Sequence, residues 1–148
     1  MVSEDKLFEL FINPESPLYV GTNPPLFNIE ENMDNTPCLG GFGTLCITPT
    51  LDLNICVSLP MAVANLNIIS IKNVWMDAIH HNPESKLYQW QAVTNSDLTE
   101  CYKEDYCKFC HYCAGMGYLE NGYLKKSDIL CKQAKAKQRA FNYLKDQN

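Results

Sequence analysis

The chain has 148 residues, of which 46% are hydrophobic and 20% are charged, and its net charge is −5. This composition excludes a disordered chain, and the length is that of about one domain. The sequence contains no apolar run of the ~18 residues that a membrane-spanning helix needs. We therefore expect a globular, soluble protein that does not contact a membrane.

Charge is unevenly distributed along the chain. Residues 1–100 carry a net charge of −9, whereas residues 101–148 carry +4. A basic segment beside cysteines is typical of some nucleic-acid-binding zinc proteins. Lysines also offset the negative charge of metal-bound thiolates, and we favour this second explanation.

The N-terminal region predicts one short helix and an extended connection. Ser3 is placed to cap a helix that reaches Ile12, with acidic residues in its first turn and an apolar side. Residues 16–37 contain several prolines and no periodic pattern, which favours an extended segment. We assign residues 1–36 to a helix followed by a bridge.

The next segment predicts a glycine-rich loop and a hairpin. Cys38 precedes three closely spaced glycines, as a loop that covers a metal centre would require. Residues 45–48 and 53–57 predict the two strands of the hairpin. Cys46 is isolated from the other cysteines in the sequence, so we favour a buried structural thiol over a metal ligand there.

Two helices are expected in the middle of the chain. The first is capped by Ser70, and the second can begin at Pro83. We expect Trp75 and Trp90, one on each helix, in the core. The two adjacent histidines after the first helix point in different directions, which suits a helix end at the surface better than a shared metal.

Cysteine is the strongest functional signal. Cys101, Cys107, Cys110 and Cys113 lie within thirteen residues with two C-x2-C spacings, and Cys131 begins a predicted C-terminal helix. No basic region followed by an apolar segment opens the sequence, so we expect a reducing, cytoplasmic compartment rather than disulfides. Reduced thiolates in this pattern indicate zinc or an iron–sulfur cluster, and the spacing alone does not choose between them.

The residues around these cysteines add three expectations. Gly115, Gly117 and Gly122 predict a loop before the final helix, which covers residues 129–144. The interleaved tyrosines and lysines could bind a nucleic-acid single strand, but shielding of a cluster from water explains the tyrosines more simply. His111 could replace a thiolate ligand, although the nearby cysteines suffice without it.

Taken together, these features resemble the SPASM domain, the C-terminal auxiliary-cluster domain of radical S-adenosylmethionine enzymes that modify peptides and proteins. Cys38 corresponds to the first cysteine of that family, and residues 47–56 correspond to its hairpin of the form I-x-P-x-G-x-V-x-x-C. Residues 70–75 match its S-L-x-x-I-W segment. The resemblance extends from Pro37 to about Arg139.

The resemblance implies up to two 4Fe-4S clusters. Three cysteines are assigned to the first cluster: Cys38, Cys56 and Cys113. Four cysteines are assigned to the second: Cys101, Cys107, Cys110 and Cys131. The first cluster then needs a fourth ligand, which could be Cys46, solvent or a substrate group.

The chain also departs from the family pattern. Leu51 stands where the hairpin has glycine. The central spacing is C-x5-C-x2-C-x2-C, so Glu104 occupies a position where the family has cysteine, and Cys107 is the expected substitute. Glu104 is therefore a further candidate ligand, and the sequence supports one or two clusters.

The radical-generating motif C-x3-C-x2-C does not occur in the sequence, so we do not expect the chain to be catalytic alone. The resemblance implies an auxiliary domain, residues 37–148, that relays electrons or positions a peptide or protein substrate. Its partner would be a radical S-adenosylmethionine barrel, in the same longer chain or in a separate protein. The alternative is a zinc-stabilised module that binds protein or nucleic acid. The expected fold class is α+β, with a hairpin and helices around cysteine-rich loops.

Overall fold

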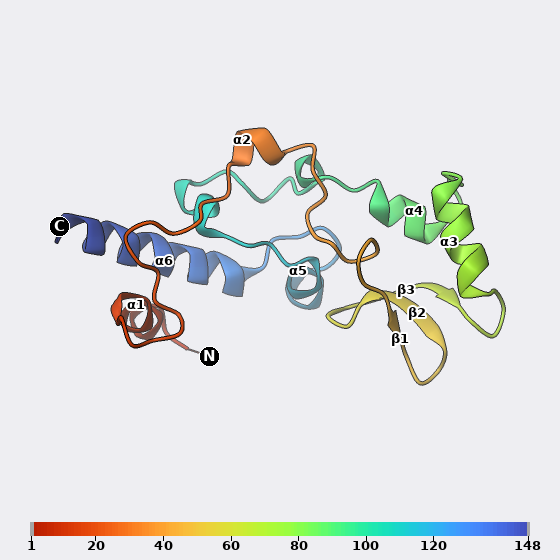
Figure 1. Ribbon diagram of the computed structural model, residues 1–148, viewed down its shortest axis with the longest axis horizontal. Helices are drawn as coiled ribbons and strands as arrows, with labels where there is room; N and C mark the ends of the chain where they lie inside the picture. The colour runs from red at the N-terminus through yellow and green to blue at the C-terminus, as the bar shows by residue number, and fades with distance from the viewer. Residues whose placement is uncertain (1, 148) are drawn as a thin grey trace.

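The computed structural model describes residues 2–147, apart from the side chain of Glu30. Met1, the first residue of the predicted region 1–36, and Asn148, the last residue of the predicted region 37–148, lie outside the described residues. The fold is α+β, as expected, and the molecule is elongated. The sheet lies at one end with α3 and α4, and α1 and α6 lie at the other end (Figure 1). The cysteine-rich segment runs between these two ends.

The α-helices are α1 (Glu4–Ile12), α2 (Ile29–Asn32), α3 (Ile71–Ile79), α4 (Lys86–Gln91), α5 (Ala114–Asn121) and α6 (Asp128–Asp146). Two 3-10 helices are η1 (Asn95–Asp97) and η2 (Asp105–Phe109). The strands are β1 (Cys46–Ile47), β2 (Asp52–Cys56) and β3 (Leu59–Asn65). No helix among the described residues is long and apolar enough to cross a membrane.

Helix α1 forms where the sequence predicts it and packs against α6. The Ser3 hydroxyl accepts a hydrogen bond from the Lys6 amide at 3.2 Å, which satisfies one amide of the first turn. Phe11, only 3% exposed, packs with Ala136 and Ala140 of α6. Small residues on α6 let the two helices approach closely, so this end of the molecule has its own hydrophobic cluster.

The hairpin is confirmed, and the structure adds a third strand. The antiparallel sheet has the order β1-β2-β3, and Cys46 pairs with Asn54 while Cys56 pairs with Leu59. We did not predict β3 because its turn consists of Val57 and Ser58, without the glycine or asparagine that marks most two-residue hairpin turns. The turn places Cys56 at the end of β2.

The larger hydrophobic cluster joins the sheet to α3, α4 and α5. The Ser70 cap is confirmed, because its hydroxyl accepts from the Asn73 amide at 3.2 Å. Helix α4 begins after Ser85 rather than at Pro83, since Ser85 provides the capping hydroxyl. Trp90 is 1% exposed, but Trp75 is 36% exposed, so its predicted core position is wrong. The buried side of α3 is narrow and consists of small residues.

The predicted glycine loop after Cys113 is wrong. Gly115 and Gly117 belong to α5, and Gly122, at φ +102°, ends it. A Cβ atom at Gly115 would overlap the Ser58 carbonyl, and one at Gly117 would overlap the Lys125 carbonyl. These glycines therefore allow α5 to pack directly against the backbone of neighbouring segments. In the sequence alone, glycines needed for such packing look the same as glycines that mark a loop.

Candidate cysteine centres

Four cysteines from two separate parts of the sequence surround one cavity between the two ends of the molecule. The cavity has a volume of about 140 Å³, well above the about 10–15 Å³ that one water molecule needs. Its thiols come from Cys101, Cys107, Cys110 and Cys131. We call these residues the four-thiol group.

Local backbone structure explains how the four thiols come to lie together. Cys101 follows η1 and bonds its amide to the Leu98 carbonyl at 2.9 Å. The tight 3-10 turns of η2 carry Cys107, and the Cys110 amide donates to the Cys107 carbonyl at 2.9 Å. Cys131 lies in the first turn of α6, which packs directly against η2. Packing of α6 on η2 therefore brings the last cysteine to the other three.

Burial favours the protonated form of three thiols in the group, those of Cys101, Cys110 and Cys131. Partial burial, followed by the neighbouring thiolates, raises the pKa of Cys101 to about 11 and that of Cys110 to about 12. Burial also raises the pKa of Cys131, with Cys107 as the next cause. Only a bound cation could hold these thiols together as thiolates near pH 7, so cation binding would release protons.

These raised pKa values predict that alkali destabilises the metal-free protein. An unfolded cysteine loses its proton near pH 8.5, whereas folded Cys101 and Cys110 keep theirs to about pH 11 and 12. Their contribution to stability is complete below pH 8.5 and is lost as the pH rises through the folded values. In chelator-treated protein, the urea midpoint should decrease from pH 8.5 upward.

Other groups titrate in the same range, so the control is the double variant Cys101→Ser, Cys110→Ser. Hydroxyls do not titrate there, and the decrease should be smaller in this variant. Equal pH profiles for the two proteins would contradict the raised thiol pKa values.

Lysines on α6 and on the segment before it face the four-thiol group. The Lys126 ammonium lowers the pKa of Cys101 and Cys131, although burial outweighs it. Lys137 acts in the same direction on Cys110. The basic C-terminal region therefore places positive charge where thiolates would carry negative charge, consistent with the explanation favoured from the sequence.

A second group consists of three cysteines at the sheet end. Burial raises the pKa of Cys38, the Gly40 amide lowers it by hydrogen bonding, and nearby Cys56 and Cys113 raise it. Cys56 ends β2, and Cys113 directly precedes α5. We call these residues the three-thiol group.

The glycine-rich loop after Cys38 is held by Trp90. The Trp90 indole donates to the Gly40 carbonyl at 2.6 Å. A Cβ atom at Gly41, which has φ +81°, would lie 2.6 Å from the indole ring. Only glycine allows this contact, so the buried Trp90 fixes the loop that carries Cys38.

Tyr112 lies between the two groups. It lines the cavity of the four-thiol group, and burial raises its pKa, with charges on Cys101, Cys113 and Cys38 as further causes. Its hydroxyl donates to the Lys125 carbonyl at 3.1 Å. This ring therefore lies close to members of both groups.

The remaining sequence candidates take different positions. Cys46 is half-buried on β1 opposite Asn54. Unlike Cys56 and Cys113, it is not among the groups that shift the pKa of Cys38. Glu104 lines the cavity of the four-thiol group, so it remains a candidate ligand. His111 is exposed and lines a separate groove. Among the side chains that the structure describes, no set of three His, Cys, Asp or Glu residues is arranged to hold a single metal ion.

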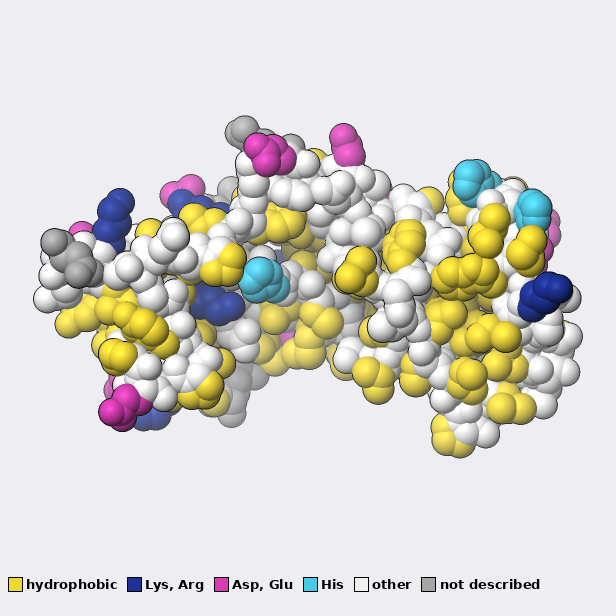
Figure 2. Space-filling view, viewed as in Figure 1, with side chains coloured by type: hydrophobic (Ala, Val, Ile, Leu, Met, Phe, Trp, Pro, Cys, Tyr) yellow, Lys and Arg dark blue, Asp and Glu magenta, His cyan; other side chains and the backbone are white. Residues whose placement is uncertain are grey.

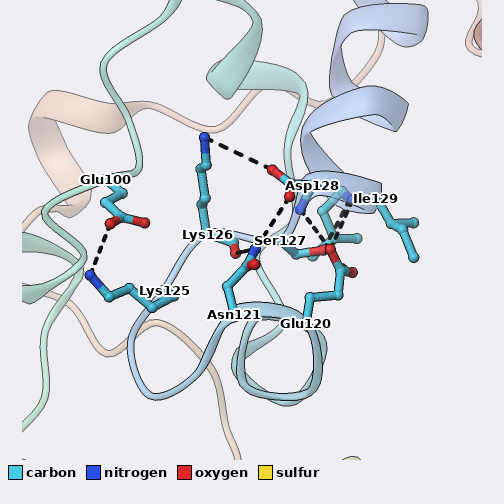
Figure 3. A network of polar contacts seen from close by, with 9 residues as sticks. Glu100, Glu120, Asn121, Lys125, Lys126, Ser127, Asp128 and Ile129 are labelled. Carbon is cyan, nitrogen blue, oxygen red and sulfur yellow. Dashed lines mark hydrogen bonds and ion pairs between the residues drawn. The ribbon is translucent and has the colours of Figure 1, made fainter.

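Sequence reasoning missed Glu120, which anchors the start of α6 (Figure 3). Its carboxylate accepts hydrogen bonds from the Ser127 hydroxyl at 2.8 Å and from the amides of Asp128 and Ile129 at 2.7 and 3.2 Å. A carboxylate at a helix N-terminus is favoured by the helix dipole. No sequence signal marks this role, because Glu120 lies on the preceding helix. It fixes the turn that presents Cys131.

We expect Glu120→Ala to lower the free energy of unfolding by about 1–2 kcal/mol, as loss of a helix cap usually does. It should also speed alkylation of Cys131 in the metal-free protein. Urea denaturation and mass spectrometry of alkylated peptides measure the two effects. Glu84→Ala, which removes an exposed carboxylate, is the control and should change neither. Equal stability of the two variants would contradict the capping role.

Comparisons of the chain with protein-family models, curated proteins and solved structures found no match. The structure itself defines an α+β protein with two groups of cysteines, one of four and one of three, on either side of Tyr112. The same two sets of residues were assigned to two clusters by the resemblance, and their role as ligands stays a prediction.

Proposed function

We propose that this chain is an auxiliary 4Fe-4S domain of a radical S-adenosylmethionine enzyme that modifies a peptide or protein. The observation that carries the proposal is the cavity of the four-thiol group, to which two distant parts of the chain contribute cysteines. Thiolate is the donor that iron–sulfur clusters require, and the cavity has room for a group larger than one ion. Such a cluster supplies one-electron transfer when bound.

The residues of the chain have distinct roles in this proposal. Cys101, Cys107, Cys110 and Cys131 would hold the cluster, and lysines from α6 would offset its charge. Tyrosines that line the cavity would exclude water, which affects the reduction potential. The three-thiol group would hold a second cluster, with a fourth position supplied by Cys46, solvent or substrate. The radical-generating barrel would belong to the same longer chain or to a partner.

The test is metal and sulfide analysis, with a visible spectrum, of protein purified without oxygen. We expect a brown protein with about eight irons and eight sulfides per chain if both groups are filled, and about four if one is. Colourless protein with one or two zinc ions would overturn the proposal. That result would support the alternative, a zinc-stabilised interaction module, because zinc also accepts all-thiolate coordination.

A further inference from the structure

A groove lies beside the four-thiol group and is not part of its cavity. Its volume is about 260 Å³, close to the lower end of the about 300–1,000 Å³ typical of ligand pockets. The floor is formed by Phe11 and Phe109, which are 3% and 4% exposed. Phe109 and His111 flank Cys110 in the chain, so the groove and the cavity of the four-thiol group share one short segment of backbone.

The outer wall of the groove is the proline-rich segment between α1 and α2, which is tied down at both ends. The Val20 amide donates to the Phe11 carbonyl at 2.9 Å, and the Phe27 amide donates to the Lys108 carbonyl at 2.8 Å. The Phe27 ring also stacks on Tyr102, with centroids 5.2 Å apart. Prolines fix further backbone angles in this wall. The groove is therefore preformed, which lowers the entropy cost of binding.

The chemistry of the lining indicates the occupant. Apart from His111 and Lys137, the lining residues are prolines and hydrophobic or aromatic residues. Leu18, on the wall, is 49% exposed and would be covered by a ligand. No acidic side chain among the described residues lines the groove. A ligand with apolar groups and a carboxylate would match both the wall and the basic rim.

Lys137 has no ion pair with a described carboxylate, in contrast to its neighbour on α6. Arg139 forms an ion pair with Asp5 at 2.8 Å. Within residues 2–147 no described carboxylate lies within ion-pair distance of Lys137, which lies 5.9 Å from the centre of the Phe11 ring. In Figure 2, a basic side chain and a histidine lie near each other among hydrophobic side chains on the half of the molecule that contains α6.

We propose that this groove binds a short acidic peptide segment, in which one carboxylate meets Lys137 and His111 and neighbouring apolar side chains cover Leu18. A peptide fits better than nucleic acid, because the two phenylalanine rings of the floor are buried and a single lysine on the rim matches one carboxylate rather than a run of phosphates. The inference rests on the proposed function in one respect only, namely that the bound peptide is the substrate of the enzyme. Binding itself does not need the cluster.

The test uses two pools of acetylated pentapeptides with random apolar residues around a central Glu or a central Gln. The purified 148-residue protein should retain the Glu pool about tenfold better, as expected for a charge-assisted hydrogen bond. Leu18→Glu introduces a negative charge into the wall and should abolish this preference. Leu26→Glu is the matched control, because Leu26 is 47% exposed but does not line the groove, and it should retain the preference.

Equal retention of the two pools, or equal loss in both leucine variants, would overturn the groove proposal. Binding of a thymidine oligonucleotide without binding of the Glu pool would also overturn it and point to nucleic acid. Metal analysis of the same preparations separates the two proposals. Selective binding of the Glu pool by colourless zinc protein would overturn the cluster proposal and support the groove proposal. Iron-loaded protein that does not distinguish the two pools would support the cluster proposal and overturn the groove proposal.

Discussion

Cys110→Ala is expected to remove the iron of the four-thiol group, about four irons per chain, and to lower the stability of the loaded protein. A bound group at a thousand times its dissociation constant stabilises the folded state by about 4 kcal/mol. Loss of that amount corresponds to a decrease in Tm of about 8–16 °C for a chain of this size. Iron analysis and thermal unfolding under anaerobic conditions measure both effects.

Cys46→Ala is the matched control, because Cys46 is also a half-buried thiol but lies on β1. We expect little iron loss in this variant. Chelator-treated Cys110→Ala should melt close to chelator-treated wild type, because the large difference comes from the bound group. Full iron content in Cys110→Ala would contradict its assignment. Loss of about four irons in Cys46→Ala would instead identify it as the fourth ligand of the three-thiol group.

Gly115→Ala is expected to have the second large effect, although alanine is the better helix former by about 1 kcal/mol. The added Cβ atom would overlap the carbonyl of Ser58, which is backbone and cannot turn away. Helix α5 would have to move off the β2–β3 turn, at a cost of about 1–3 kcal/mol for overpacking. Since Cys113 directly precedes α5, we also expect loss of iron from the three-thiol group.

Gly43→Ala is the control for Gly115→Ala. A Cβ atom at Gly43 would lie 3.9 Å from the nearest atom, the Leu39 carbonyl oxygen, and this residue does not have a positive φ angle. We expect unchanged iron content and a stability within about 0.5 kcal/mol of wild type. Denaturant unfolding and iron analysis of the two variants decide the point. If Gly115→Ala were as stable as Gly43→Ala, the close contact between α5 and the turn would be contradicted.

The error at Gly115 and Gly117 shows where local sequence signals fail. Glycine lowers helix propensity, so three glycines in eight residues favour a loop when the sequence is considered alone. In the structure, two of the three lie where α5 contacts the backbone of other segments, at Ser58 and Lys125. Trp75 gives the complementary error. It has the correct helical spacing for a buried position, but the side of α3 that faces the sheet is occupied by Val74 and Ala78.

The sequence by itself determined the features that depend on near neighbours in the chain. The Ser3 and Ser70 caps, the hairpin and the final helix all follow from local hydrogen bonding and periodicity, and the cysteine spacing indicates thiolate chemistry. The resemblance assigns those cysteines to two groups, and tertiary structure decided how the members of each group come together. Packing of α6 on η2 brings Cys131 to the four-thiol group, and contact of α5 with the β2–β3 turn brings Cys113 to Cys38. These contacts join residues far apart in the chain, so they depend on packing that local patterns do not encode.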